Sequence, residues 1–184
     1  MFGTSKKKQN PSADDPMEVP EAHEVLGTPL KPPFPEGMRE LIVGMGCFWS
    51  PEKLFWQIDG VYTTAVGYAG GETPHPTYRE VCNGGTGHAE VVRVVFDPDV
   101  VSDRELIEIF WDNHRPSRGM GQGVDRTSQY RSALYATDGD QLELAREIRA
   151  KRQDERGGEI GTDIRKDIEF YYAEPYHQQY KAKR

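Results

Sequence analysis

The sequence is poor in cysteine: Cys47 and Cys82 are its only two thiols in 184 residues. Two cysteines are too few for a disulfide scaffold, and they lack the paired spacing of a structural zinc site. We therefore expect no metal and a reducing compartment. In such a compartment a cysteine is either a small buried hydrophobe or a reactive thiolate, and its neighbours decide which.

Long apolar runs and extended basic stretches are also lacking. No stretch approaches the roughly 20 apolar residues that span a bilayer, and none follows the lysines at positions 6–8 as a secretory signal would require. The formal net charge is -7, which disfavours a surface for nucleic acid. We expect a cytoplasmic protein that binds neither membrane nor nucleic acid.

Proline is unevenly distributed, since seven of the 13 prolines fall within residues 1–37. Proline fixes φ and removes an amide donor, so helix and sheet are both disfavoured there. We predict an extended, proline-rich N-terminal arm at 1–37. Residues 38–184 are expected to form a single catalytic domain, because that length supports one hydrophobic core.

Apolar periodicity predicts strands and helices in alternation. Helices are expected to begin near Ser50 and Ser102, each followed by an apolar stripe, and a charged helix is expected to begin near Asp138. Residues 115–129 show no periodicity and are expected to form a long ordered loop with a functional reason. The order predicts an α+β fold, a two-layer α/β sandwich with a mixed sheet that elaborates the ferredoxin-like arrangement. The expected strands are 40–46, 61–68, 88–96, 130–136 and 168–172.

Cys47 follows an apolar strand and precedes a helix. Helix N-terminal amides stabilise a thiolate, and α/β folds open their clefts at the carboxyl ends of strands. Phe48 and Trp49 come next and either join the core or line an apolar pocket beside the sulfur. This context favours a reactive thiol, and the alternative is a buried filler.

Glu90 is in register with Val92, Val94 and Phe96, so strand alternation predicts that its carboxyl faces the covered side of the sheet. Burial would raise the pKa of that carboxyl and make it a general acid. The alternative is a solvated glutamate at the end of a strand. His88 shares this face and either serves Cys47 as a base or caps a turn.

Three spaced motifs resemble the peptide methionine sulfoxide reductase family of the A type. They are residues 46–49 (Gly-Cys-Phe-Trp), 87–90 (Gly-His-Ala-Glu) and 129–132 (Gln-Tyr-Arg-Ser). The resemblance covers about residues 37–181. It includes residues 67–71 (Gly-Tyr-Ala-Gly-Gly), 78–81 (Tyr-Arg-Glu-Val) and 176–180 (Tyr-His-Gln-Gln-Tyr).

The resemblance implies thiol-dependent reduction of methionine S-sulfoxide, free or in peptides and proteins, in the repair of oxidised proteins. It makes Cys47 the nucleophile, which ends as a sulfenic acid, and Glu90 the acid that protonates the departing oxygen. No cofactor is implied, because the thiol itself carries the electrons.

The resemblance also assigns the residues around the nucleophile. Tyr78 and Tyr130 would donate hydroxyl hydrogen bonds to the sulfoxide oxygen, and Asp125 would orient the substrate. Phe48 and Trp49 would hold the methyl group. Without the resemblance, the two tyrosines fit ordinary packing aromatics and Asp125 fits a loop cap.

The sequence departs from the family in its thiols. Many members carry recycling cysteines in a glycine-rich tail after the motif at 176–180, whereas this sequence ends at Arg184 with none. Either such a tail was removed, or thioredoxin, glutaredoxin or a small thiol reduces Cys47 directly. Cys82 is the only internal candidate for a resolving cysteine. Ser50 replaces the more usual glycine and is expected to tighten the helix cap.

Two other classes of function compete with this interpretation. A cysteine hydrolase or acyltransferase would pair Cys47 with His88 or His114, form a thioester and need no reductant. A binding module for methionine peptides would keep the aromatic pocket but lack turnover, even with abundant dithiol.

Overall fold

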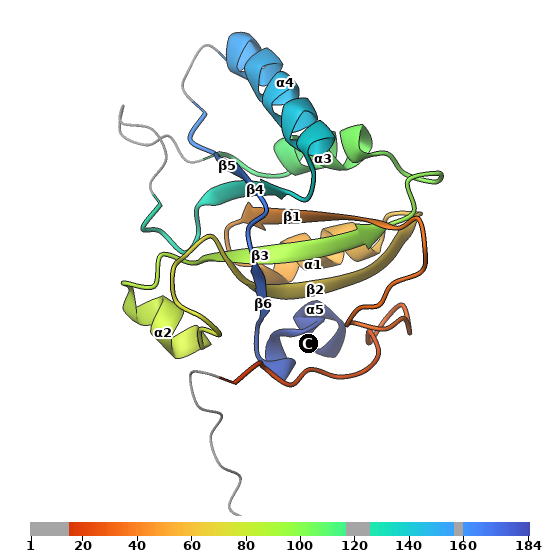
Figure 1. Cartoon of the computed structure of the whole chain (residues 1–184), viewed down its shortest axis with the longest axis vertical. Helices are drawn as coiled ribbons and strands as arrows, with labels where there is room; N and C mark the ends of the chain where they lie inside the picture. The colour runs from red at the N-terminus through yellow and green to blue at the C-terminus, as the bar shows by residue number, and fades with distance from the viewer. Residues whose placement is uncertain (1–14, 117–125, 157–159) are drawn as a thin grey trace, which may run out of the picture.

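The computed structural model describes residues 15–116, 126–156 and 160–184, which build a six-stranded sheet with helices packed against it (Figure 1). The strand order is β5-β4-β1-β3-β2-β6, with β4 and β5 parallel and the other neighbours antiparallel. This mixed sheet confirms the predicted α+β class. The strands are β1 (Arg39–Met45), β2 (Val61–Ala69), β3 (Ala89–Phe96), β4 (Ser132–Ala136), β5 (Asp163–Lys166) and β6 (Phe170–Tyr172). The helices are α1 (Trp49–Trp56), α2 (Tyr78–Asn83), α3 (Asp103–Asp112), α4 (Gly139–Arg156) and α5 (Tyr180–Lys183), with a 3-10 turn at Pro175–His177.

The sheet is strongly curled. β5 and β6 lie at opposite edges, yet only residues 167–169 separate them in the sequence. Four steps of about 3.5 Å span at most about 14 Å, whereas five strand spacings of about 4.8 Å would put flat outer strands about 24 Å apart. Figure 1 shows this blue segment crossing in front of the sheet. Curling therefore brings the two edges together.

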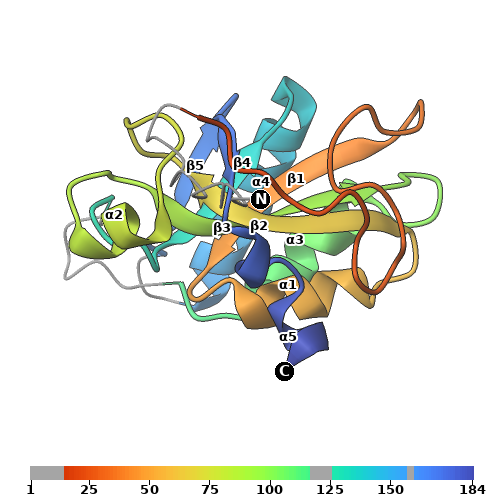
Figure 2. The ribbon, with the colours of Figure 1, turned by 90° about the horizontal axis from the view of Figure 1, so that it is seen from below.

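The main core lies between the sheet and α1, α3 and α4. Alternate residues of β1 and β3 point to this side, as period-2 patterning requires. Figure 2 shows α1 and α3 on the same side of the strands. The cluster includes Leu41, Val43, Phe55, Val92, Val94, Phe96, Leu106, Phe110, Leu134 and Ile148. Burying this apolar surface holds the end of β1 firmly against the start of α1.

Residues 15–37 pack against both the sheet and α1 without a helix or strand of their own, apart from a bridge between Ala22 and Pro29. Leu30 is fully buried, and its carbonyl oxygen accepts a hydrogen bond of 2.7 Å from Arg93. The Arg93 guanidinium also lies over the rings of Phe34 and Phe170. The division into an arm and a domain stays a prediction.

The helix caps follow the local sequence at two of three expected starts. Ser102 accepts a hydrogen bond from the amide of Glu105, and Asp138 accepts one from that of Gln141. The prediction for Ser50 was wrong, because α1 begins at Trp49 with Phe48 as its N-cap and Ser50 lies inside the first turn. The Phe48 side chain makes no capping hydrogen bond. The expectation that Ser50 tightens the helix cap was therefore also wrong.

The sequence pattern did not predict the shortest helices and strands. α2 has six residues and is capped by Thr77, whose hydroxyl oxygen accepts from the amide of Glu80. Such a helix is too short for a periodic stripe. β5 and α5 have four residues each and were also not predicted. The loop expected at 115–129 lies mostly outside the described residues. Within the described ranges, no helix has the length and apolar character to cross a membrane.

Candidate active site

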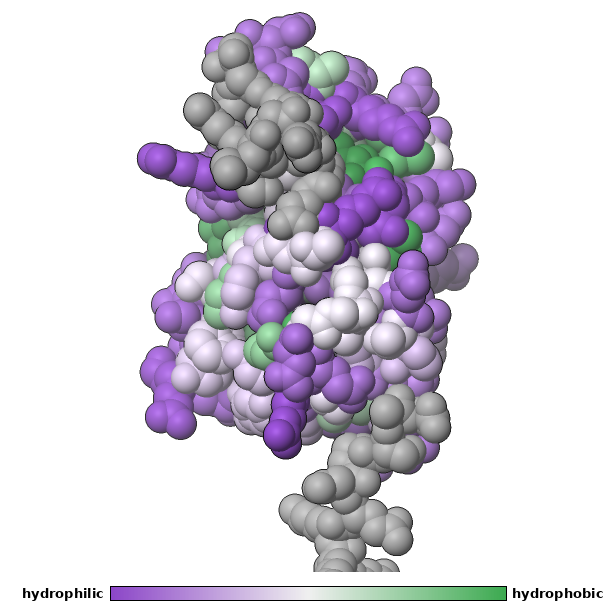
Figure 3. Space-filling model, turned by 90° about the vertical axis from the view of Figure 1, so that its left-hand side faces the viewer, coloured by the Kyte–Doolittle hydropathy of each residue, from purple (hydrophilic) through white to green (hydrophobic). Residues whose placement is uncertain are grey.

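Cys47 and Glu90 meet at one end of the two central strands because β1 and β3 are antiparallel neighbours. Cys47 lies just beyond the end of β1, and Glu90 is the second residue of β3. Gly46 forms the turn before the cysteine with φ +86, a conformation that suits glycine. Figure 3 shows this side of the molecule, where surface of intermediate hydropathy is framed by hydrophilic side chains.

The Cys47 thiol is exposed but partly desolvated. Desolvation of the sulfur raises its pKa, and the charge of Glu90 acts in the same direction. The amide of Trp49 and the charge of Lys181 favour the thiolate but do not outweigh burial. The expected amide contact is therefore present, while the expected net stabilisation of a resting thiolate is absent.

Glu90 is buried, as the alternation of β3 predicts, with a relative exposure of 1%. Its Oε1 accepts from the amide of Phe48 at 3.4 Å, and its Oε2 accepts from Nε2 of Gln129 at 3.1 Å. Burial raises the pKa of this carboxyl, and the two hydrogen bonds oppose the rise only in part. Glu90 can therefore keep its proton at a pH where a solvated glutamate is ionised.

Cys82 lies in the same polar network as Glu90. Nε2 of Gln129, which binds Glu90, also lies 3.5 Å from the sulfur of Cys82. A hydrogen bond with Cys82 raises the pKa of the Tyr78 hydroxyl. Tyr130 is half-exposed. Its pKa is raised mainly by partial burial and also by the charges of Glu90, Cys82 and Cys47. The structure thus brings Tyr78 to Cys82, and Tyr130 near Cys82, Cys47 and Glu90.

Five rings form an aromatic wall beside Cys47: Phe48, Trp49, Tyr78, His177 and Tyr180. The indole of Trp49 stacks on Tyr180 with 3.8 Å between ring centroids and donates to Nδ1 of His177 at 3.0 Å. His177 also contacts Phe48 and Tyr78, with centroid distances of 5.1 and 4.7 Å. Phe48 is fully buried and Trp49 half-buried, so Phe48 belongs to the core as well as to the wall.

His177 and Tyr180 were not singled out by the sequence as site residues. Burial lowers the pKa of His177 to about 4, so the imidazole is neutral near pH 7. Its Nδ1 accepts from Trp49, which places the proton on Nε2. The motif at 176–180 was the only sequence signal for these two residues. Both contact Trp49, about 130 positions away, and no local pattern spans that separation.

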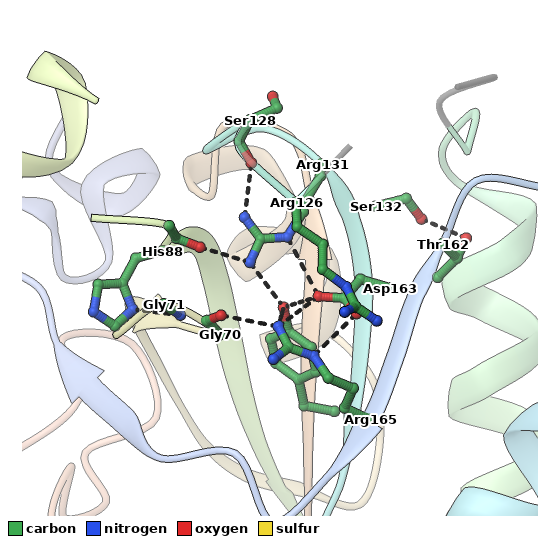
Figure 4. Close-up of polar contacts among 12 residues, drawn as sticks. Gly70, Gly71, His88, Arg126, Ser128, Arg131, Ser132, Thr162, Asp163 and Arg165 are labelled. Atoms are coloured by element: carbon green, nitrogen blue, oxygen red, sulfur yellow. Dashed lines mark hydrogen bonds and ion pairs between the residues drawn. The ribbon is translucent and has the colours of Figure 1, made fainter. Parts of the chain in front are cut away.

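A buried arginine joins the loop before β3, which leads to Glu90, to the loop that carries Gln129 (Figure 4). Nη1 of Arg131 donates to the carbonyl oxygen of Ser128 at 2.9 Å, and Nη2 donates to that of Gly87 at 2.8 Å. Ser128 immediately precedes Gln129, and Gly87 lies three residues before Glu90. Arg131 thereby sets the spacing between the two sides of the polar network.

Asp163 holds Arg131 in place, and both side chains have zero exposure. Its carboxylate accepts from Arg131 at 3.4 Å, from Arg165 at 2.7 Å and from the Tyr135 hydroxyl at 2.7 Å. Burial alone would raise the pKa of Asp163. Hydrogen bonds from Arg165 and Tyr135 and the arginine charges outweigh burial and hold that pKa below its usual range. We call these four residues the Asp163 cluster.

Comparison with known proteins identifies this arrangement. The family model described as peptide methionine sulfoxide reductase matches residues 39–184, most of the chain. The chain belongs to the peptide methionine sulfoxide reductase family.

Relatives of this reductase family match nearly the whole chain. A peptide methionine sulfoxide reductase MsrA of Rhodospirillum centenum is 56% identical over 178 residues, 95% of this chain and 81% of the relative. A mitochondrial peptide methionine sulfoxide reductase of Bos taurus is 51% identical over 183 residues, 97% of this chain and 78% of the relative.

Solved reductase structures share the fold. Methionine sulfoxide reductase A of Corynebacterium diphtheriae aligns with a TM-score of 0.80 and 43% identity, over 92% of this chain and 84% of that one. Mxr1 of Saccharomyces cerevisiae in complex with Trx2 aligns with a TM-score of 0.56 and 25% identity, over 84% of this chain and 93% of that one.

The two histidines that a hydrolase would need are engaged elsewhere in this reductase. His88 accepts from the amide of Gly71 at Nδ1, and its Nε2 contacts the carbonyl oxygen of Thr73 at 2.7 Å. It therefore caps a turn, the second of the two roles open to it. His114 contacts the carbonyl oxygen of Phe110 and the hydroxyl of Ser132.

Three further points concern the cavity beside Cys47, the predicted Asp125 and metal ions. A cavity of about 320 Å³ beside the nucleophile is lined by Met45, Cys47, Ser50, Pro51, Leu54 and Asn113, and shares none of its lining with the aromatic wall. Asp125, which the resemblance assigns to substrate orientation, lies outside the described residues. In the part of the chain that the structure describes, no group of three or more His, Cys, Asp and Glu residues could hold a metal ion.

Proposed function

We propose that Cys47 is the nucleophile and Glu90 the general acid with which this oxidoreductase reduces methionine S-sulfoxide to methionine. The observation that carries the assignment is the pairing of an exposed thiol with a buried carboxyl of raised pKa. The amide of Phe48, the residue after the nucleophile, links the two by its 3.4 Å contact with Glu90.

The chemistry requires both groups at once. A sulfoxide oxygen leaves poorly until it is protonated, while the sulfur accepts a nucleophile. Cys47 attacks the sulfur and forms a sulfur–sulfur bond with it, while Glu90 supplies a proton to the oxygen. The sulfur–oxygen bond and the new sulfur–sulfur bond then both break as the hydroxyl group passes to Cys47. One sulfoxide and one thiol thus become one methionine and one sulfenic acid, with two electrons supplied by the sulfur of Cys47. The thiol proton returns the acid to its starting state.

The neighbouring rings are proposed to bind and polarise the substrate. Tyr78 and Tyr130 are the hydroxyl donors to the sulfoxide oxygen, which their placement near Cys47, Cys82 and Glu90 supports. Phe48 and Trp49 hold the methyl group on the apolar side. Methyl and oxygen on opposite sides of the sulfur would select one epimer. The role of Asp125 stays a prediction.

Cys82 is proposed to resolve the sulfenic acid. The sulfur of Cys82 would attack the sulfur of oxidised Cys47 and form a disulfide, and the displaced hydroxyl would leave as water with the proton of the Cys82 thiol. The shared contact of Gln129 with Glu90 and Cys82 supports this, because it places the second thiol in the network of the acid. A dithiol reductant would then reduce the disulfide.

We propose a reductant of the thioredoxin class, or a glutaredoxin, as the partner. The solved complex of yeast Mxr1 with Trx2 supports this class. We also propose the cytoplasm as the compartment, because Cys47 and Cys82 are both free thiols, which a reducing compartment maintains. Oxidised proteins and peptides are the proposed substrates.

Single-turnover reduction tests these roles. The S and R epimers of a methionine sulfoxide peptide are mixed with excess enzyme and no reductant, and methionine and the masses of both cysteines are recorded. We expect S-only reduction, its loss in Cys47→Ser, and a Cys47–Cys82 disulfide in the unmodified chain. Cys82→Ser should leave one equivalent of methionine and a persistent sulfenic acid on Cys47.

Two results would contradict the assignment. A persistent sulfenic acid with Cys82 intact would remove Cys82 from the cycle and leave an outside thiol as the resolving group. If neither epimer yields methionine although the peptide binds, the chain is a binding module and the catalytic roles of Cys47 and Glu90 are wrong.

A further inference from the structure

A fully buried carboxyl lies five residues after the nucleophile and takes no part in the proposed chemistry. Glu52 has zero exposure. Its Oε1 accepts from the amide of Gln179 at 2.7 Å, and its Oε2 accepts from Nε2 of Gln179 and from the hydroxyl of Thr64, both at 2.8 Å. These contacts join α1, β2 and the C-terminal segment.

The direction of these hydrogen bonds is settled by their partners. Nδ1 of His23 accepts from two backbone amides, of Val25 and Leu26, so its proton is on Nε2. That Nε2 donates to the hydroxyl oxygen of Thr64 at 2.8 Å, and the Thr64 hydroxyl donates its own hydrogen bond to Glu52. Glu52 therefore meets three donors and acts only as an acceptor.

Burial raises the pKa of Glu52, and the hydrogen bonds from Gln179 and Thr64 oppose that rise. A buried carboxyl is costly unless its hydrogen bonds are fully made. Here they hold a strained residue: Gln179 is left-handed, with φ 48. Its neighbours along the chain are Gln178 and Tyr180, and His177 precedes them. His177 and Tyr180 are the two partners of the Trp49 indole. The geometry of the aromatic wall thus depends on Gln179.

The N-terminal segment supports the same point from the other side. The amide of Glu24 donates to Oε1 of Gln179 at 3.2 Å, so both ends of that side-chain amide are bound. His23 is buried and packs edge-on against Trp56 with 5.6 Å between centroids. Three separate segments of the chain therefore converge on Gln179.

We propose that Glu52 is a positioning residue for substrate binding: with Thr64 and His23 it holds Gln179, and through Gln179 it orients His177 and Tyr180 against Trp49. The proposal rests on the proposed function, because it gives the aromatic wall the task of holding the substrate. Glu52 does not touch the reacting atoms. Its loss should weaken binding of the sulfoxide without slowing oxygen transfer in the bound complex.

The test uses the full chain in single-turnover reduction at varied concentrations of a methionine S-sulfoxide peptide. Glu52→Gln replaces an acceptor with a donor that faces Gln179 or Thr64 in either flip. Leaving one buried donor without its acceptor corresponds to a rise of about tenfold in the half-saturating concentration. The saturating rate and the rate of Cys47 alkylation by iodoacetamide should stay within about twofold.

Two threonines give a matched pair. Thr64→Val removes the hydroxyl donor to Glu52 and should raise the half-saturating concentration about threefold. Thr63→Val is the same change at the preceding residue, which is also buried but whose hydroxyl has no hydrogen-bond partner among the residues that the structure describes. It should bind substrate as the unmodified chain does. The double variant Glu52→Gln/Gln179→Glu returns a carboxylate to the contact and should recover most of the affinity.

Unchanged half-saturation in a folded Glu52→Gln protein would overturn the proposal, as would a fall in the saturating rate alone. Equal effects of Thr63→Val and Thr64→Val would also overturn it, because they would indicate a general loss of packing. Failure of the proposed function is distinguishable, since the unmodified chain would then transfer no oxygen to Cys47 at any concentration.

Discussion

Asp163→Asn should destabilise the fold through a single buried ion pair. Asp163 and Arg131 both have zero exposure, so the substitution leaves the Arg131 charge buried without its carboxylate. Arg165 loses the same partner, although its side chain is 29% exposed and water can replace part of the contact. Arg126 also contacts Asp163, but its side chain is 63% exposed and contributes little.

The magnitude follows from the burial of Arg131. Removing one partner of a buried pair costs about 3 to 5 kcal/mol. The lower figure applies here, because asparagine can still accept from the Tyr135 hydroxyl and Arg131 keeps its two carbonyl contacts. With a urea dependence of about 2 kcal/mol per molar, a loss of about 3 kcal/mol lowers the unfolding midpoint by roughly 1.5 M.

The effect should depend on pH in a definite direction. The pKa of Asp163 is held below its usual range in the fold. Its contribution is therefore present above the unfolded pKa and is lost as pH falls through the folded pKa. The difference between the unmodified chain and Asp163→Asn should be full at pH 7 and shrink in strong acid.

Equilibrium urea unfolding at pH 7, followed by tryptophan fluorescence, measures the loss. Asp167→Asn is the matched control, because its ion pair with Lys166 is exposed and asparagine tolerates its positive φ of 57. It should change the free energy of unfolding by less than about 0.5 kcal/mol. If Asp163→Asn also changed the free energy of unfolding by less than about 0.5 kcal/mol, the claim that this pair holds the two loops together would be refuted.

Three more outcomes follow from the site. Glu90→Gln should reduce the single-turnover rate by about 10² to 10⁴, measured as methionine formed, because the acid is lost. Burial raises the pKa of Glu90, so the fold favours the protonated carboxyl. The stabilising effect of protonated Glu90 is full below the unfolded pKa and is lost as pH rises through the folded pKa. At pH 8 we therefore expect Glu90→Gln to unfold at a higher urea concentration than the unmodified chain. Gly70→Ala should cost about 2 kcal/mol more than Gly84→Ala in urea unfolding: both glycines have positive φ, but a Cβ at Gly70 would lie 2.2 Å from the Tyr135 hydroxyl, whereas that at Gly84 meets open space. Equal losses would show that the contact with Tyr135 relaxes freely.

Local rules predicted those features that depend on neighbours in the sequence. The alternation of β3 placed Glu90 on the covered side with Val92 and Val94, because side chains of a strand alternate whatever lies around them. The caps at Ser102 and Asp138 formed for a similar reason, since each bonds an amide three residues away. The family motifs likewise pointed to Cys47.

The same rules failed where a distant partner decided the outcome. Ser50 had the pattern of an N-cap, yet α1 begins earlier, and the carboxyl of Glu90 contacts the amide of its actual N-cap, Phe48. His88 shared the face of Glu90 in the pattern, but its ring binds the loop at Gly71 and Thr73. Neither partner is within reach of a local pattern.

The sequence by itself determined the class of fold, the buried acid and the family, because alternation, capping and motif spacing act over a few residues. Only the tertiary structure decided that Cys82 joins the network of Glu90, that His177 and Tyr180 complete the aromatic wall, and that Asp163 supports Arg131 from 32 residues away. These contacts depend on strand order and on the curl of the sheet. Both arise from packing the whole chain at once, and no local periodicity encodes them.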